Sequence, residues 1–158
     1  MKKLLALFLL GTFLSASAQA TEHMVVMSKQ GKFEDVKQDL VMAIENRGLK
    51  VTHTNHIGDM LTRTGAAVGD TTEVYDQAEQ VEFCKAALSR EMMKADPSNI
   101  VFCPYIISIY TTPSAKGRVF VAYRKPVAFN TSKATDKALK GVDDLLSGIV
   151  KDAIQGSF

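Results

Sequence analysis

Two β-rich runs that flank a turn constrain the fold of this chain more than any other feature. Residues 100–110 and 118–123 are rich in β-branched and aromatic side chains, and residues 113–117 between them include proline, serine and glycine. β-branched and aromatic residues favour strands, whereas proline, serine and glycine favour turns. The pattern predicts a β-hairpin. Pro104 cannot donate a backbone hydrogen bond, so we expect it at an edge, at a bulge or among the first residues of its strand.

The remaining segments indicate an α+β domain. Apolar residues recur at helical spacing over 33–44 and 139–153, with charged residues between them. Strands mixed with two such amphipathic helices predict a largely antiparallel sheet packed by both helices. The other predicted strands are 24–28, 49–55 and 81–84, and shorter helices are predicted over 58–69 and 86–95.

The first 20 residues have the three regions of a secretory signal peptide. Lys2 and Lys3 precede an apolar run over 4–14, and small residues then lead to Ala18-Gln19-Ala20. As a helix the apolar run would rise only about 16 Å, against roughly 30 Å of membrane hydrocarbon. We therefore expect cleavage after Ala20. The mature chain, residues 21–158, is then one globular domain without a membrane span, either periplasmic or secreted.

Charge and composition exclude several classes of protein. The chain has 19 Lys and Arg against 17 Asp and Glu, and loss of Lys2 and Lys3 leaves 17 against 17. A nucleic-acid binder would carry a clear basic excess, so no nucleic-acid partner is expected. With 46% hydrophobic and 23% charged residues, the composition is that of an ordinary globular domain.

Cys84 and Cys103 are the only cysteines. An even number in an exported protein favours a disulfide, and closing this loop of about 20 residues would contribute roughly 3 kcal/mol. The alternative is a reactive thiol pair, although the spacing is not that of the C-x-x-C oxidoreductases.

Three histidines suggest metal sites. His53 and His56, with both cysteines, have the ligand types of a Zn or Cu site, although their spacing is not diagnostic. Cleavage after Ala20 would also place His23 third in the mature chain, where the terminal amine and the imidazole suit Cu(II) or Ni(II). The competing interpretation is ordinary surface histidines, and folding is expected to require no cofactor.

An acidic stretch and the absence of catalytic motifs complete the inventory. The stretch contains no Lys or Arg and reads as a solvated face; its members are Asp70, Glu73, Asp76, Glu79 and Glu82. The sequence has no G-x-S-x-G, Walker or H-E-x-x-H motif and no dinucleotide fingerprint. An enzyme is therefore the less favoured interpretation.

Several segments together resemble the bacterial domain-of-unknown-function family 302. The most specific are Val81-Glu82-Phe83-Cys84, Ser89-Arg90-Glu91-Met92-Met93 and Phe102-Cys103-Pro104-Tyr105, and the resemblance covers about residues 24–154. It implies a compact α+β domain related in shape to TATA-binding-protein-like folds. It also implies that His56, Cys84 and Cys103 match the recurrent His and Cys of the family, but it supplies no activity.

Two functional hypotheses follow. The first is a non-catalytic exported module, monomeric or homodimeric, that binds a small ligand or an envelope protein, with Cys84 and Cys103 in a disulfide. The second is a metal or thiol-redox site, with Zn or Cu as the metal, in which both cysteines act as thiolates. His56 would be the third ligand, or the base that activates a thiol.

Overall fold

The structure is a computed structural model that describes residues 23–156. The predicted signal peptide and its cleavage site lie outside these residues.

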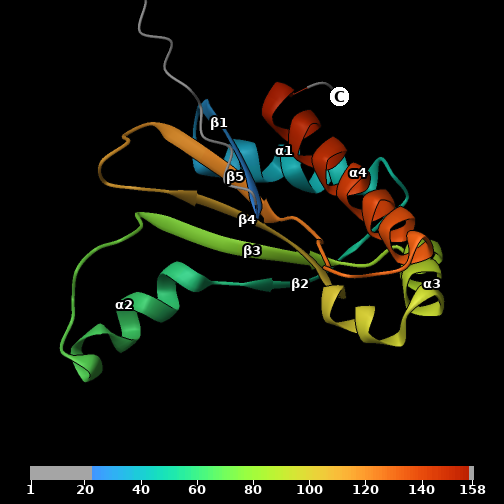
Figure 1. The fold of residues 1–158 in the computed structure, drawn as a ribbon. Coiled ribbons are helices and arrows are strands. Elements are labelled where there is room, and N and C mark those ends of the chain that lie inside the picture. The colour runs from blue at the N-terminus through green and yellow to red at the C-terminus, as the bar shows by residue number, and fades with distance from the viewer. Residues whose placement is uncertain (1–22, 157–158) are drawn as a thin grey trace, which may run out of the picture.

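Within the described residues, five strands form one sheet in which every hydrogen-bonded pair is antiparallel (Figure 1). Their order across the sheet is β1-β5-β4-β3-β2, so the first strand of the chain lies beside the last. β4 and β5 form the predicted hairpin. The strands are β1 (Met24–Gln30), β2 (Val51–Asn55), β3 (Gln77–Phe83), β4 (Tyr105–Thr111) and β5 (Arg118–Arg124).

The α+β class is confirmed, but residues 23–156 form four α-helices where the predicted packing used two. They are α1 (Phe33–Glu45), α2 (Ile57–Val68), α3 (Ala86–Ala95) and α4 (Lys133–Gln155), and a 3-10 helix, η1 (Pro97–Phe102), follows α3. α3 joins α1 and α4 in the layer against the sheet because Met92 is completely buried in the core. No helix among the described residues is long and apolar enough to cross a membrane.

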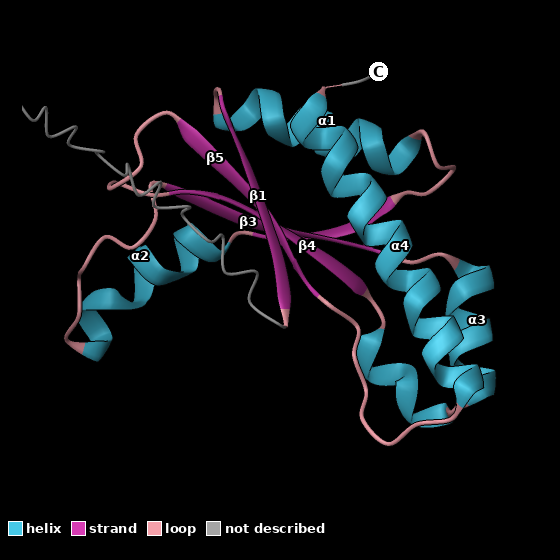
Figure 2. Cartoon of the chain, turned by 45° about the horizontal axis from the view of Figure 1, so that its top comes forward, coloured by secondary structure: helices cyan, strands magenta, loops and turns pink. Residues whose placement is uncertain are grey.

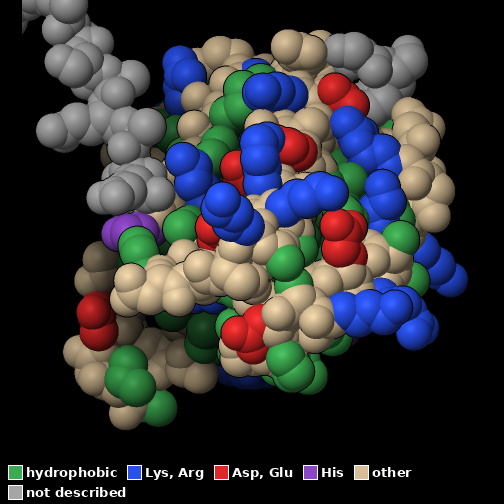
Figure 3. Space-filling view, turned by 45° about the vertical axis from the view of Figure 1, so that its right-hand side comes forward, with side chains coloured by type: hydrophobic (Ala, Val, Ile, Leu, Met, Phe, Trp, Pro, Cys, Tyr) green, Lys and Arg blue, Asp and Glu red, His purple; other side chains and the backbone are tan. Residues whose placement is uncertain are grey.

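The core lies between the helical layer and one face of the sheet (Figure 2). Alternate residues of the central strands point into it, and Ile107, Ile109 and Val121 have no exposed surface. α4 supplies nine buried residues on one stripe, as its sequence pattern predicts. Lys and Arg side chains spread over the outer side of this layer (Figure 3), so that side is solvated.

The opposite face of the sheet, which we call the open face, is not covered by α1, α3 or α4. In Figures 1 and 2 the sheet separates α1 and α4 from α2, which stands away from the helical layer. Met24, Val26 and Ile106 point to the open face and are 45%, 44% and 38% exposed. The molecule is therefore a two-layer sandwich with one apolar sheet face in contact with solvent.

The predicted strand over 100–110 was wrong in its first half. Residues 97–102 form η1, because the Asp96 side chain accepts a hydrogen bond from the Ser98 amide and Pro97 favours the first turn of a helix. β4 begins only at Tyr105, directly after Pro104, which follows a cis peptide bond. β3 also starts earlier than the predicted residue 81, because its polar first residues pair with β4 from Gln77 onward.

Candidate functional site

The seam between β4 and β5 is the irregular part of the sheet. β1 pairs with β5 over seven residues, and β3 pairs with β4 over seven. β4 and β5 pair only over three, Ser108–Tyr110 with Phe120–Ala122. Toward Tyr105 and Arg124 the two strands no longer pair, so the sheet consists of a three-stranded part and a two-stranded part that separate at this end.

A cavity of about 600 Å³ lies at the unpaired end of the seam. We call it the seam cavity. It is lined by residues from both faces of the sheet, which is possible only where the strands are apart. Its volume is in the range of small-molecule sites. Its lining includes Tyr105, Ile106 and Ser108 from β4, Ala122, Tyr123 and Arg124 from β5, and Val142 and Leu146 from α4.

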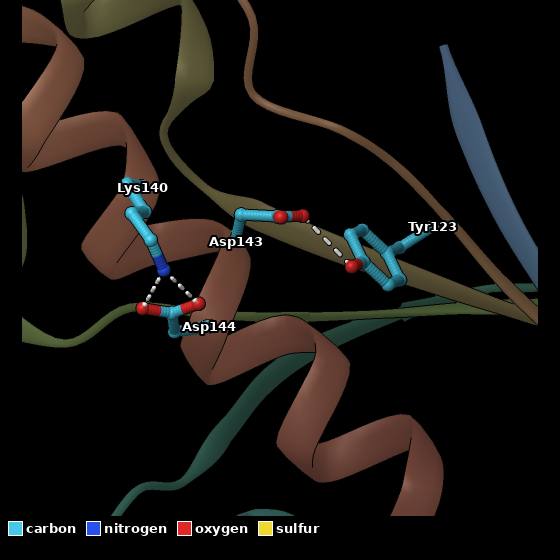
Figure 4. A network of polar contacts seen from close by, with 4 residues as sticks. All are labelled: Tyr123, Lys140, Asp143 and Asp144. Carbon is cyan, nitrogen blue, oxygen red and sulfur yellow. Dashed lines mark hydrogen bonds and ion pairs between the residues drawn. The ribbon is translucent and has the colours of Figure 1, made fainter. Parts of the chain in front are cut away.

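Two buried tyrosines form the inner wall of the seam cavity, and each is fixed through its hydroxyl. The Tyr123 hydroxyl donates to Asp143 Oδ1 on α4 at 2.8 Å (Figure 4). The Tyr105 hydroxyl lies 3.1 Å from Ser89 Oγ on α3. The Tyr105 ring also packs edge-on against Phe83. Because both hydroxyls are bonded, the rings present rigid apolar surfaces to the cavity.

Both tyrosines are neutral at physiological pH. Burial raises the pKa of Tyr123, and the hydrogen bond to the Asp143 carboxylate raises it further. Burial also raises the pKa of Tyr105, against the opposing effect of Ser89. Neither side chain has the depressed pKa that a general base or nucleophile requires. The tyrosines therefore shape the wall of the cavity as neutral side chains.

The mouth of the cavity carries the polar groups. Of its 15 lining residues only His23, Gln80, Ser108 and Arg124 are polar apart from the tyrosines. The Gln80 amide donates to Ser108 Oγ at 3.2 Å, so these two are partly satisfied by each other. Arg124 has no carboxylate partner within residues 23–156. An apolar cavity with one unpaired guanidinium at its mouth suits a molecule with an apolar body and an anionic end.

Cys84 and Cys103 lie together at the border of this site. Their Sγ atoms are 3.0 Å apart and not bonded, and Cys103 precedes Pro104, which lines the cavity. Cys103 Sγ is also 3.8 Å from Ser89 Oγ, the partner of Tyr105. The pair is therefore connected to the inner wall through Ser89.

The Cys84 thiol is not activated. Although part of the residue is exposed, desolvation raises its pKa to about 11, and the contact with Cys103 and the charge of Glu82 act in the same direction. Reactive and metal-binding cysteines instead have pKa values lowered by positive surroundings. This environment suits a structural pair better than a thiol nucleophile.

His56 does not join the two cysteines. Its Nδ1 lies 3.3 Å from Glu79 Oε1 near the start of β3, whereas Cys84 follows the end of that strand. Cys84 comes five positions after Glu79, which is about 16 Å along an extended strand. The described residues contain no group of three or more His, Cys, Asp or Glu side chains that could hold a metal ion.

Glu79 also corrects the interpretation of the acidic stretch as a solvated face. Only 13% of its side chain is exposed, and Lys37 Nζ lies 2.7 Å from its Oε2. The carboxylate therefore links α1 to β3, and its Oε1, which accepts a hydrogen bond from Lys37, also lies near His56 Nδ1. Asp70, Glu73 and Asp76 are exposed, as expected.

His23 is the first described residue and lines the mouth of the seam cavity. Its backbone carbonyl accepts a hydrogen bond from the Lys125 amide at 3.0 Å. The rest of the predicted N-terminal copper or nickel site, Thr21 and Glu22, lies outside the described residues.

Sequence reasoning missed the seam cavity and its key residues, Tyr105, Tyr123 and Arg124. One signal was available: both tyrosines fall at core-facing positions of their strands, where a hydroxyl needs a specific partner.

The arrangement defines a class of protein: a two-layer α+β domain whose split antiparallel sheet holds a ligand-sized cavity. Residues 24–153 match the family described as "Domain of unknown function DUF302", and the chain belongs to this family. The crystal structure of an uncharacterized conserved DUF302 protein from Bacillus stearothermophilus is similar, with a TM-score of 0.69 and 12% sequence identity. The match covers 82% of this chain and 97% of that one, and at this identity it shows the fold alone. No curated protein matches the chain.

Proposed function

We propose that this protein is an exported, non-catalytic binding module whose seam cavity takes a small amphipathic molecule with an anionic end. The observation that carries the proposal is the cavity itself: a space of about 600 Å³ between two strands that should otherwise pair. Closing this space would add two or three residue pairs between β4 and β5, so a sequence that keeps the strands apart favours an occupant. The apolar body of the ligand lies against Tyr105 and Tyr123.

Arg124 supplies the recognition of the anionic end. Its guanidinium lies at the mouth and lacks an acidic partner among the described residues. It can therefore form an ion pair with a ligand carboxylate or sulfonate. A charge-assisted bond of this kind contributes about 1.5–3 kcal/mol when shielded from water. At a partly open mouth we expect the lower end, which is about tenfold in affinity.

Export and the disulfide belong to the same proposal. The signal-peptide pattern supports delivery to an oxidising compartment. There, the disulfide of an exported oxidoreductase would accept the two electrons and two protons that Cys84 and Cys103 lose. The sulfurs are close enough for the bond to form with a small local movement. A disulfide here would fix the start of β4, next to the cavity, to the end of β3.

The test uses two probes of the expected chemistry, dodecanoate and the fluorescent sulfonate 8-anilinonaphthalene-1-sulfonate, titrated into the mature chain. We expect saturable binding of one probe per cavity, with the two probes competing. Ala122→Phe fills the seam and should abolish binding, whereas Ala87→Phe, at an exposed position on α3, should leave it unchanged.

The second pair of variants tests the anion. Arg124→Met should weaken dodecanoate binding about tenfold, whereas Arg90→Met, which removes an exposed arginine from α3, should not. Failure of either probe to bind, or binding that survives Ala122→Phe, would contradict the proposal.

A further inference from the structure

The helix α2 and the loop after it form an arm that its own chain leaves largely unpacked. We define the arm as residues 57–75. The only buried residue of α2 is Gly65, whereas α1 has five buried residues and α4 has nine. Gly65 is pressed against the arm's own loop, where a Cβ atom would come within 2.6 Å of the Asp70 carbonyl oxygen. The ends of the arm contact the sheet of their own chain, Gly58 at Ala78 of β3 and Tyr75 at Tyr110 of β4, and the part between them folds on itself.

One side of α2 is apolar and faces solvent. At 100° per residue, Met60, Leu61 and Val68 fall within one third of the helix circumference, and Asp59 and Arg63 fall outside it. Met60 is 38% exposed, Leu61 39% and Val68 74%, and Val74 of the loop is 50% exposed. An amphipathic helix normally buries such a side, but within the described chain Met60 and Val68 stay exposed, on either side of Thr64.

The open face of the sheet is the complementary feature. Met24, Val26 and Ile106 give it apolar character, and Arg118 gives it charge. Arg118 donates only to the neutral Ser28 hydroxyl, at 3.0 Å, and has no carboxylate partner in residues 23–156. Glu82, the acidic residue of this face, is already bonded to Asn55.

The charges of the two surfaces are opposite. The arm has three acidic residues, Asp59, Asp70 and Glu73, against one basic residue, Arg63, and all four are exposed. The open face presents Arg118, which lies at the end of β5 away from the seam cavity. An acidic apolar arm and a basic apolar face in one chain are self-complementary, as the two halves of a twofold-symmetric interface must be.

We propose that this face is covered by a second copy of the chain, in a dimer in which the arm of each copy docks on the open face of the other. α2 is about 18 Å long, and with its loop about 15 Å wide, so each arm covers roughly 270 Å² in projection. Each copy contributes one arm and one patch of equal size, roughly 540 Å². Accessible area exceeds projected area when side chains interdigitate, so this approaches the 800 Å² per partner of a standard interface.

The dimer also affects the seam cavity, because the open face includes residues of the cavity mouth such as Ile106 and Arg124. In this arrangement the arm of one copy lies beside the cavity mouth of the other and pairs with Arg118, which leaves Arg124 to the ligand. The proposal does not depend on ligand binding, since its test measures mass and not occupancy.

The test begins with the molar mass of the mature chain at micromolar concentrations, measured by light scattering and sedimentation equilibrium. We expect a dimer. The arm variant Met60→Asp/Val68→Asp and the face variant Val26→Asp should each raise the dimer dissociation constant at least tenfold. Ala87→Asp adds the same charge at an exposed helical position on the other side of the molecule and should leave the dimer intact.

Mixing the two defective variants tests which surfaces meet. A dimer of one arm variant and one face variant has a native arm on a native face at one of its two contacts, so mixing should partly restore dimer mass. All substituted positions are exposed, and circular dichroism confirms that each variant is folded. A monomeric wild type, a dimer insensitive to the arm variant, or a mixture that gains no dimer would overturn the proposal.

Discussion

The hydrogen bond between Tyr123 and Asp143 gives the sharpest test of how the seam cavity is built. Tyr123→Phe removes only the hydroxyl that donates to Asp143 Oδ1 at 2.8 Å. Hydrogen bonds to charged groups contribute about 1.5–3 kcal/mol, and Tyr123 is only 3% exposed. Because Asp143 is half-buried and gains water in the variant, we expect a loss of about 1–2 kcal/mol in the free energy of unfolding.

The assay is urea unfolding of the wild type, Tyr123→Phe, Asp143→Asn and the double variant. The double-mutant cycle should give a coupling of about 1 kcal/mol or more, since the residues are in direct contact. Tyr75→Phe is the matched control, because no hydroxyl hydrogen bond of Tyr75 is found among the described residues. A coupling near zero, or a loss in Tyr75→Phe equal to that in Tyr123→Phe, would refute the reasoning.

The same bond makes a prediction about pH. The pKa of Tyr123 is raised in the folded state, so the unfolded chain ionises this tyrosine first, near pH 10. The stabilisation is therefore complete below pH 10 and is lost as pH rises above it. Wild-type stability should fall more steeply than that of Tyr123→Phe between pH 9.5 and about 11.

Two further predictions concern the thiol pair and the core. In the reduced protein the pKa of Cys84 is raised to about 11, so its alkylation by iodoacetamide at pH 8 should be about tenfold slower than that of an unperturbed thiol. This factor allows for the higher nucleophilicity of a more basic thiolate. Mass spectrometry of the alkylated peptide gives the rate, and a rate equal to that of an unperturbed thiol would contradict the raised pKa. Ile109→Ala, at a completely buried position, should lower the free energy of unfolding by about 2–5 kcal/mol. Val26→Ala, on the open face, should lower it by less than about 1 kcal/mol. Both are measured by urea unfolding, and similar losses would contradict the distinction between the core and the open face.

Much of the fold could be predicted from the sequence because local and long-range preferences agree. α4 has an apolar stripe over its whole length, and the hairpin strands have strong β propensity on both sides of a turn. The error over residues 97–102 has a local cause: Asp96 and Pro97 form a helical start that outweighs the β propensity of Ile100 and Val101. Predicting η1 requires comparing the stabilisation from the Asp96 cap with the β propensity of the residues that follow it.

The candidate site could not be predicted because it depends on how two strand pairs fit together. β5 follows β1 over its full length and β4 follows β3, and the two ribbons share only three residue pairs. No pattern within one segment reports that loss of pairing. The contact between Cys84 and Cys103 agrees with the pairing expected from their even number. The position of His56 instead depends on the path of β2 and on its partner Glu79.

The most direct test of the binding proposal is a nuclear magnetic resonance titration of the isotope-labelled chain over residues 21–158 with dodecanoate. The account predicts saturable shifts of the backbone signals of Tyr105, Tyr123 and Arg124, with the signals of α1 unchanged. The same titration of Ala122→Phe should show none of these shifts. Absence of saturable shifts in the wild type, or shifts confined to the arm over residues 57–75, would contradict the assignment of the seam cavity as the binding site.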